Sequence, residues 1–150
     1  MKQLSHVDAQ GRARMVDVSA KPAMHREAVA RGEIRLQKAT LKLVQSRAVA
    51  KGNVLAAARL AGILAAKRTG DLIPLCHPLP LNHCQVNFEF PKTRDRIVII
   101  ASAKIAAQTG VEMEALTAVS IAALTIYDMC KAVDKQMRVT DIHLVSKTKR

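Results

Sequence analysis

The spacing of hydrophobic residues along this chain of 150 residues is helical in some stretches and has the period of two of a strand in others. Residues 53–69 are rich in alanine and leucine, begin with Asn53, which caps helices well, and end before Gly70. These features predict a helix. A second helix is expected over residues 111–134, where alanines permit close packing against a neighbour.

Strands are predicted where the pattern changes to a period of two. Residues 85–90 alternate polar and apolar side chains, and residues 96–105 continue with a β-branched run after a polar turn, which together predict an antiparallel hairpin. Shorter strands are expected at residues 34–36 and 139–145. Helices and mainly antiparallel strands that share one core predict an α+β sandwich.

The composition predicts a single domain over residues 1–150, because 49% of the residues are apolar and can bury a core. We expect residues 1–14 and 148–150 to be mobile. The N-terminus has no apolar run behind its first lysine, and no apolar stretch resembles a membrane span. We therefore expect a cytoplasmic protein that makes no contact with membranes.

The charge predicts a phosphorylated partner. Lysine and arginine number 24 against 12 acidic residues, a formal charge of +12, which attracts phosphates. Proteins that bind single-stranded nucleic acid add aromatic side chains for stacking, but aromatic residues make up only 2% of this chain. A small phosphorylated ligand is therefore favoured, and a basic nucleic-acid-binding module is the alternative.

A proline-rich loop over residues 72–80 surrounds Cys76 and His77 and should be stiff. A stiff loop suits a binding histidine, but a plain connection in which His77 is solvated or caps a neighbouring group is an equally good interpretation. The pairs Cys76-His77 and His83-Cys84 lack the spacing of a zinc site, because adjacent side chains of an extended chain point in opposite directions. No metal site is predicted, and the three cysteines are expected to be reduced thiols.

Five further residues could carry chemistry. Asp128 and Lys131 stand three apart on the second predicted helix, so the carboxylate can orient the ammonium, although a surface salt bridge is the commoner reason for such a pair. Lys51 comes just before a helix start, where anions are favoured, although most such lysines are simply solvated. Glu112 and Glu114 either offset the helix dipole or accept hydrogen bonds from a heterocycle.

Together these segments resemble the molybdenum-cofactor biosynthesis protein C family over nearly the whole chain. The resemblance rests on six motifs, which are Met15-Val16-Asp17-Val18-Ser19, Lys51-Gly52, Ala65-Ala66-Lys67-Arg68-Thr69, the loop from Leu72 to Leu79, Thr109-Gly110-Val111-Glu112-Met113-Glu114-Ala115-Leu116, and Tyr127-Asp128-Met129-Cys130-Lys131-Ala132-Val133.

The resemblance implies a ferredoxin-like subunit in a trimer of dimers, with each active site completed by two chains. The implied reaction converts 3′,8-cyclo-7,8-dihydro-GTP to cyclic pyranopterin monophosphate with release of pyrophosphate, and it needs no cofactor. Lys51 and Lys131 then correspond to the proton-transfer residues, and Asp128 to the catalytic carboxylate. The implied substrate-binding residues are Leu75, Cys76, His77, Glu112, Met113 and Glu114, with Arg26 and Lys147 holding phosphates.

The chain departs from the family pattern at a few positions. Ala107-Gln108 stands where Gly-Lys is common, and Asn53 stands where aspartate is usual. The glycine-rich Lys-Ser-Gly segment that commonly follows Lys147 is also absent, since the sequence ends at Arg150. These departures motivate a second alternative, a catalytically impaired relative that binds a nucleotide without converting it.

Overall fold

A four-stranded antiparallel sheet forms the frame of the protein in this computed structural model, which describes residues 4–150. The strands are β1 (Met24–Arg35), β2 (His83–Glu89), β3 (Arg96–Ala107) and β4 (Arg138–Lys149), in the spatial order β2-β3-β1-β4. The hairpin of β2 and β3 is the one that the sequence predicts, and it pairs Cys84 with Ala103.

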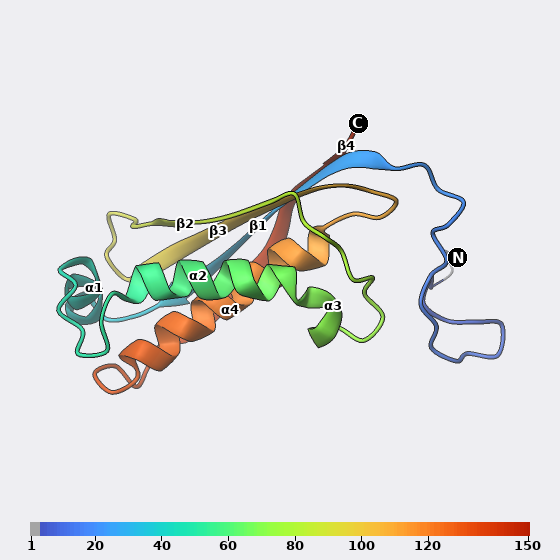
Figure 1. Ribbon diagram of the computed structural model, residues 1–150. Coiled ribbons are helices and arrows are strands. Elements are labelled where there is room, and N and C mark those ends of the chain that lie inside the picture. The colour runs from blue at the N-terminus through green and yellow to red at the C-terminus, as the bar shows by residue number, and fades with distance from the viewer. Residues whose placement is uncertain (1–3) are drawn as a thin grey trace.

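The helices are α1 (Lys38–Gln45), α2 (Val54–Lys67), the short α3 (Thr69–Leu72) and α4 (Glu112–Cys130). The two long helices, α2 and α4, lie side by side on one side of the sheet (Figure 1). Strand β1, the first long helical segment, the β2–β3 hairpin, α4 and β4 follow one another in a split β-α-β arrangement. The predicted α+β, ferredoxin-like class is confirmed.

Small residues bring α2 and α4 together. A methyl group at Gly62 would lie 2.9 Å from the carbonyl oxygen of Ala118 and 3.1 Å from Val86 Cγ2. Ala118 and Ala122 are fully buried in the same core. The alanines of both helices therefore serve the close packing that the sequence predicts.

Helix α2 matches its prediction, since Asn53 caps it by accepting a hydrogen bond from the Ala56 N–H at 3.0 Å. Helix α4 ends at Cys130, before the predicted end at Asp134. The N–H groups of Val133 and Asp134 both donate to the Cys130 carbonyl oxygen, which closes a turn in place of further helix. The prediction was wrong here because the pattern of apolar residues does not report this turn.

Two strands are much longer than predicted. The expected strand at residues 34–36 is only the end of β1, in which charged residues such as Arg31 and the buried Glu33 break the apolar pattern. Strand β4 continues beyond residue 145 to Lys149, and Lys147 pairs with Ala28 of β1. Thr148 and Lys149, which the sequence analysis expects to be mobile, therefore lie in the sheet. The sequence did not predict α1 or α3.

Helix α4 is long and apolar enough to cross a membrane by length and composition, with a mean hydropathy of 1.3. The sequence expectation overlooked this. Core helices of soluble proteins pass the same test, and α4 packs against both α2 and the sheet.

The N-terminal segment lies at the end of the molecule where α4 begins (Figure 1). The predictions that residues 1–14 are mobile and that the N-terminus lacks a secretory signal fall partly on residues 1–3. These three residues lie outside the part of the chain that the structure describes.

Candidate active site

A cavity of about 260 Å³ lies where the proline-rich loop meets the start of α4. The loop ends at residue 80 and α4 begins at Glu112, so the two are well separated in the sequence, and the fold brings them together. The N-terminal segment closes the third side with Val16, Val18 and Lys21. All six residues of the implied substrate-binding set line this cavity, namely Leu75, Cys76, His77, Glu112, Met113 and Glu114.

Glu114 is the most buried charged group of this cavity, with 3% of its surface exposed. Burial raises the pKa of its carboxyl to about 6, and the nearby charge of Glu112 adds to the rise, whereas the helix-start N–H and His77 oppose it. A carboxyl with this pKa exists in both protonation states near neutrality. Of the two roles left open, offsetting the dipole alone does not account for such burial.

His77 is tied to the N-terminal segment, because its Nε2 lies 2.7 Å from the carbonyl oxygen of Val16. The ring is therefore held by the backbone of another segment, so His77 is not simply solvated, and the alternative that it caps a neighbouring group agrees with this contact. Burial also raises the pKa of the neighbouring Cys76 thiol, with a smaller contribution from the charge of Glu114. His83 belongs to β2 and lines a different cavity, so the two Cys-His pairs do not converge.

A second cavity of about 220 Å³ adjoins the first and shares Gly110 and Glu112 with it. Arg26 lines it, with its guanidinium donating to the carbonyl oxygens of Ala107 and Gln108 at 3.1 and 3.0 Å. These acceptors belong to the backbone, so the departure at residues 107–108 does not remove them. Because the two cavities share lining residues, we refer to them together as the recess, and the second one contributes the cationic side chains of Arg26 and Lys147.

Lys147 reaches the same recess from β4 and lies 3.1 Å from Glu112 Oε1. Gly110 makes room for this pair, because a Cβ there would collide with the Glu112 carboxylate. The sequence missed Gly110 and Lys21 as site residues. Their signal was weak, since a lone glycine before a helix and a single lysine in an irregular segment are common in proteins that have no site there.

Lys51, Asp128 and Lys131 form the second group, at the other end of α4. The Lys131 ammonium lies 2.8 Å from Asp128 Oδ1, as their spacing predicts. Lys51 Nζ donates to the Asp128 carbonyl oxygen at 2.9 Å and lies 3.6 Å from Oδ2. One carboxylate therefore lies between two ammonium groups.

The electrostatics of this group follow from the pairing. The hydrogen bond and charge of Lys131 lower the pKa of Asp128, with a smaller effect from Lys51, and Asp128 in turn raises the pKa of Lys131. At Lys131 the hydrogen bond and charge of Asp128 outweigh the opposing effect of burial. All three side chains are about half exposed in the single chain, so their ion pairs contribute little to stability.

The two groups are far apart in one subunit. Asp128 follows Glu112 by sixteen residues on one helix, which places them about 24 Å apart along its axis. The recess can hold an anion and a heterocycle, and the group of three can exchange protons with a bound molecule. A small ligand cannot contact both groups within a single copy of the chain.

Comparisons with known proteins show which family the chain is similar to. A model described as the MoaC family matches residues 15–150. The protein from Chloroflexus aggregans is 61% identical over 145 residues, which cover 97% of this chain and 88% of that protein. Those from Desulforapulum autotrophicum and Parvibaculum lavamentivorans are 59% and 55% identical, and cover 99% and 98% of this chain and 91% and 92% of their own lengths.

All three relatives carry the name cyclic pyranopterin monophosphate synthase. More than half of the aligned residues are identical in each of them, and the alignments run along nearly the entire chain. The resemblance seen in the sequence motifs therefore extends along nearly the whole chain. This chain belongs to the MoaC family.

Proposed function

We propose that this chain is a lyase that converts 3′,8-cyclo-7,8-dihydro-GTP to cyclic pyranopterin monophosphate and pyrophosphate, in the synthesis of the molybdenum cofactor. The name shared by its relatives supports the reaction. The observation that carries the proposal is the group of Lys51, Asp128 and Lys131, in which one carboxylate holds two ammonium groups. The reaction opens one ring and closes others, so it needs groups that give and take protons.

Each active site, in this proposal, is shared by two copies of the chain. The recess at the start of α4 would bind the substrate, and the group of three from a second copy would face it. The half-exposed state of Lys51, Asp128 and Lys131 supports this, because proton transfer benefits from a site that excludes water. The resemblance to the family further implies that three such dimers assemble into a hexamer.

The residues of the recess have separate roles. The carboxyls of Glu112 and Glu114 would accept hydrogen bonds from the N–H groups of the heterocycle, held against the loop of Leu75, Cys76 and His77. Arg26 and Lys147 would bind the phosphates and stabilise the negative charge that develops as pyrophosphate leaves. Lys147 would exchange its contact with Glu112 for a phosphate.

In the assembled site, the pKa of Lys131 would fall. Asp128 raises this pKa in the single chain, whereas cations brought by a second copy disfavour another proton on the ammonium. A lysine whose pKa is nearer to neutrality can both give and take a proton at the reacting atoms. Lys131 would then act as the acid and base, with Asp128 holding it in place.

The test is to incubate the purified protein with 3′,8-cyclo-7,8-dihydro-GTP. Cyclic pyranopterin monophosphate is followed through its fluorescent oxidation product, and pyrophosphate is measured in parallel. We expect equal amounts of both. A folded protein that binds the substrate and releases neither product would overturn the proposal and support the impaired relative. Strong, salt-sensitive binding to generic DNA or RNA near physiological salt would instead support the nucleic-acid-binding module.

A further inference from the structure

Helix α1 begins without a cap of its own. The side chain of Gln37, at its N-cap position, makes no capping hydrogen bond, and the first turn contains no acidic residue. The first N–H groups of a helix need acceptors, and a helix of this length is marginal without them. Asp134, which follows α4 in the sequence, supplies the missing carboxylate. Its Oδ2 accepts the Gln37 N–H at 2.9 Å and the Thr40 hydroxyl at 2.9 Å.

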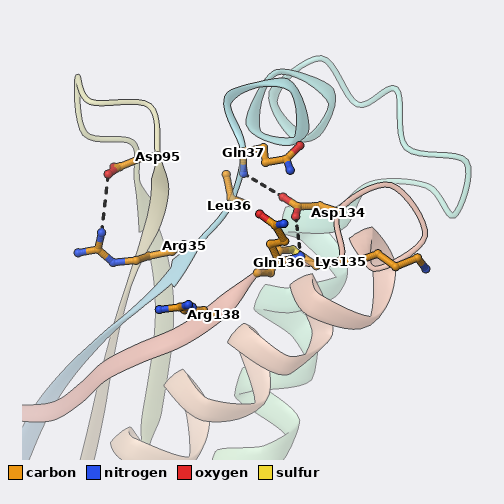
Figure 2. Close-up of a pocket in the computed structure, with 9 residues that line it drawn as sticks. Arg35, Leu36, Gln37, Asp95, Asp134, Lys135, Gln136 and Arg138 are labelled. Carbon is orange, nitrogen blue, oxygen red and sulfur yellow. Dashed lines mark hydrogen bonds and ion pairs between the residues drawn. The ribbon is translucent and has the colours of Figure 1, made fainter.

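Both carboxylate oxygens of Asp134 accept hydrogen bonds. Figure 2 shows it between Gln37 and Gln136, at the edge of a cavity of about 720 Å³. Its Oδ1 accepts the Gln136 N–H at 3.1 Å, and 1% of the residue is exposed. Burial alone would raise the pKa of Asp134, but hydrogen bonds from Gln37, Gln136 and Thr40 hold it below its ordinary value. The group is therefore a buried carboxylate aimed at α1.

Helix α1 leads directly into the segment that carries Lys51. Within the described part of the chain, each side-chain hydrogen bond or ion pair that joins residues 37–52 to other segments ends on Asp134 or Asp128. Both aspartates belong to the C-terminal end of α4 and the turn after it. Asp134 holds the first end of this segment, and Asp128 meets Lys51 near the other.

We propose that Asp134 is a positioning residue, which fixes α1 against the end of α4 and so sets where Lys51 lies relative to Asp128 and Lys131. The inference rests on the proposed function, because it assigns Asp134 to the geometry of that site. Asp134 would not touch the substrate. It would act through Lys51, since without this anchor residues 46–52 could shift while Asp128 and Lys131 stay on α4. A displacement of about 1 Å can lower a rate by roughly a hundredfold.

Three variants separate this role from general stabilisation. Asp134→Asn keeps the shape of the side chain and removes its charge, and Thr40→Val removes the hydroxyl donor, whereas Thr40→Ser retains it. Asp95→Asn is the matched control, because Asp95 lines the same cavity but its carboxylate pairs with arginines and not with α1. Each variant is studied as the full chain, well below its unfolding temperature.

The first readout is kinetic. We expect Asp134→Asn to lower kcat by about tenfold or more with KM within about twofold, because the substrate-binding recess lies at the far end of α4. Thr40→Val should show the same pattern more weakly, and Thr40→Ser and Asp95→Asn should resemble wild type. A wild-type rate in Asp134→Asn, or a loss confined to KM, would overturn the inference.

The second readout does not depend on activity, so it also applies if the proposed reaction fails for the wild-type chain. Lysines are acetylated with N-hydroxysuccinimide acetate, and labelling is followed by peptide mass spectrometry. We expect Lys51 in Asp134→Asn and Thr40→Val to react several times faster than in wild type, with Lys131 unchanged as the internal reference. Equal labelling of Lys51 in all variants would overturn the inference, whereas absence of product from wild type would overturn only the proposed function.

Discussion

At the scale of residues, the contact between Asp128 and Lys131 follows directly from their spacing on a helix. The approach of Lys51 does not, because it depends on how a separate segment returns to the end of α4. The chemistry of the trio therefore combines one local contact with one that the fold creates. Glu114 is a further case in which tertiary burial changes the properties of a residue.

Replacing Asp128 with asparagine tests the trio. Asp128→Asn keeps the size of the side chain but removes the charge that holds both lysines, so we expect kcat to fall by about a hundredfold or more. Assembly should be intact, because asparagine matches aspartate in shape and leaves the apolar surfaces of the chain unchanged. Steady-state kinetics and size-exclusion chromatography measure both. Asp141→Asn, at an exposed carboxylate paired with Arg31, is the control. Full activity of Asp128→Asn would remove Asp128 from the mechanism.

The raised pKa of Glu114 predicts that the stability of the fold depends on pH. Its carboxyl is harder to ionise in the folded chain, so the folded state binds more protons than the unfolded state between about pH 4.5 and 6. The contribution of this group to the free energy of unfolding therefore falls as pH rises through that window. Glu114→Gln removes the titration, and relative to wild type it should gain on the order of 1–2 kcal/mol between pH 4 and pH 8.

Urea denaturation of both proteins across that range measures the gain. A difference between Glu114→Gln and wild type that does not change with pH would show that Glu114 ionises in the folded chain as easily as in the unfolded chain.

At the scale of elements, the close approach of α2 and α4 shapes the layer beneath the sheet (Figure 1). The alanine-rich sequences indicate two helices with small residues, and this was correct for α2 over nearly its full length. The contact between the helices depends on Gly62, which the sequence presents only as a weak point in a helix.

Gly62→Ala tests that contact. At an exposed helix position, alanine stabilises the helix by about 1 kcal/mol relative to glycine. Here, however, its methyl group would meet the Ala118 carbonyl oxygen. We expect a net loss of about 1–3 kcal/mol in the free energy of unfolding, measured by urea denaturation. Ala56→Gly, at an exposed position of the same helix, should lose about 0.5–1 kcal/mol from helix propensity alone. Stabilisation by Gly62→Ala would mean that α2 and α4 lie further apart.

At the scale of the whole molecule, the separation of the recess from Lys51, Asp128 and Lys131 is the main feature. One subunit holds both halves of the proposed site about 24 Å apart along α4. A second copy that faces the first in the opposite direction would bring each half against its complement. This arrangement belongs to the proposal of a shared site.

Mixing two inactive variants tests the shared site. Lys51→Ala damages one half and Glu112→Gln the other, so a mixed dimer would contain one intact site and one doubly damaged site. After unfolding and joint refolding in equal amounts, we expect activity to recover to about a quarter of wild type, because half of the dimers would be mixed.

The control mixes Lys51→Ala with Asp128→Asn, two changes in the same half, and should recover nothing. Failure of the first mixture to exceed its separate components, although size-exclusion chromatography shows joint assembly, would place each complete site within one chain.

The sequence by itself determined the helix over α2, the β2–β3 hairpin, the α+β class and the pairing of Asp128 with Lys131. These depend on neighbours within a few residues, where periodicity, capping and side-chain spacing act directly. The family motifs further indicated which residues to group together.

Only the tertiary structure decided the full lengths of β1 and β4, the end of α4, the burial of Glu114 and the capping of α1 by Asp134. Charged residues hid β1 because they pair with one another across neighbouring strands, for example Arg96 with the buried Glu33. Asp134 and Gln37 are far apart in the sequence, and no local pattern reports which donor will meet a carboxylate. Such contacts depend on chain segments that approach each other only after the sheet has formed.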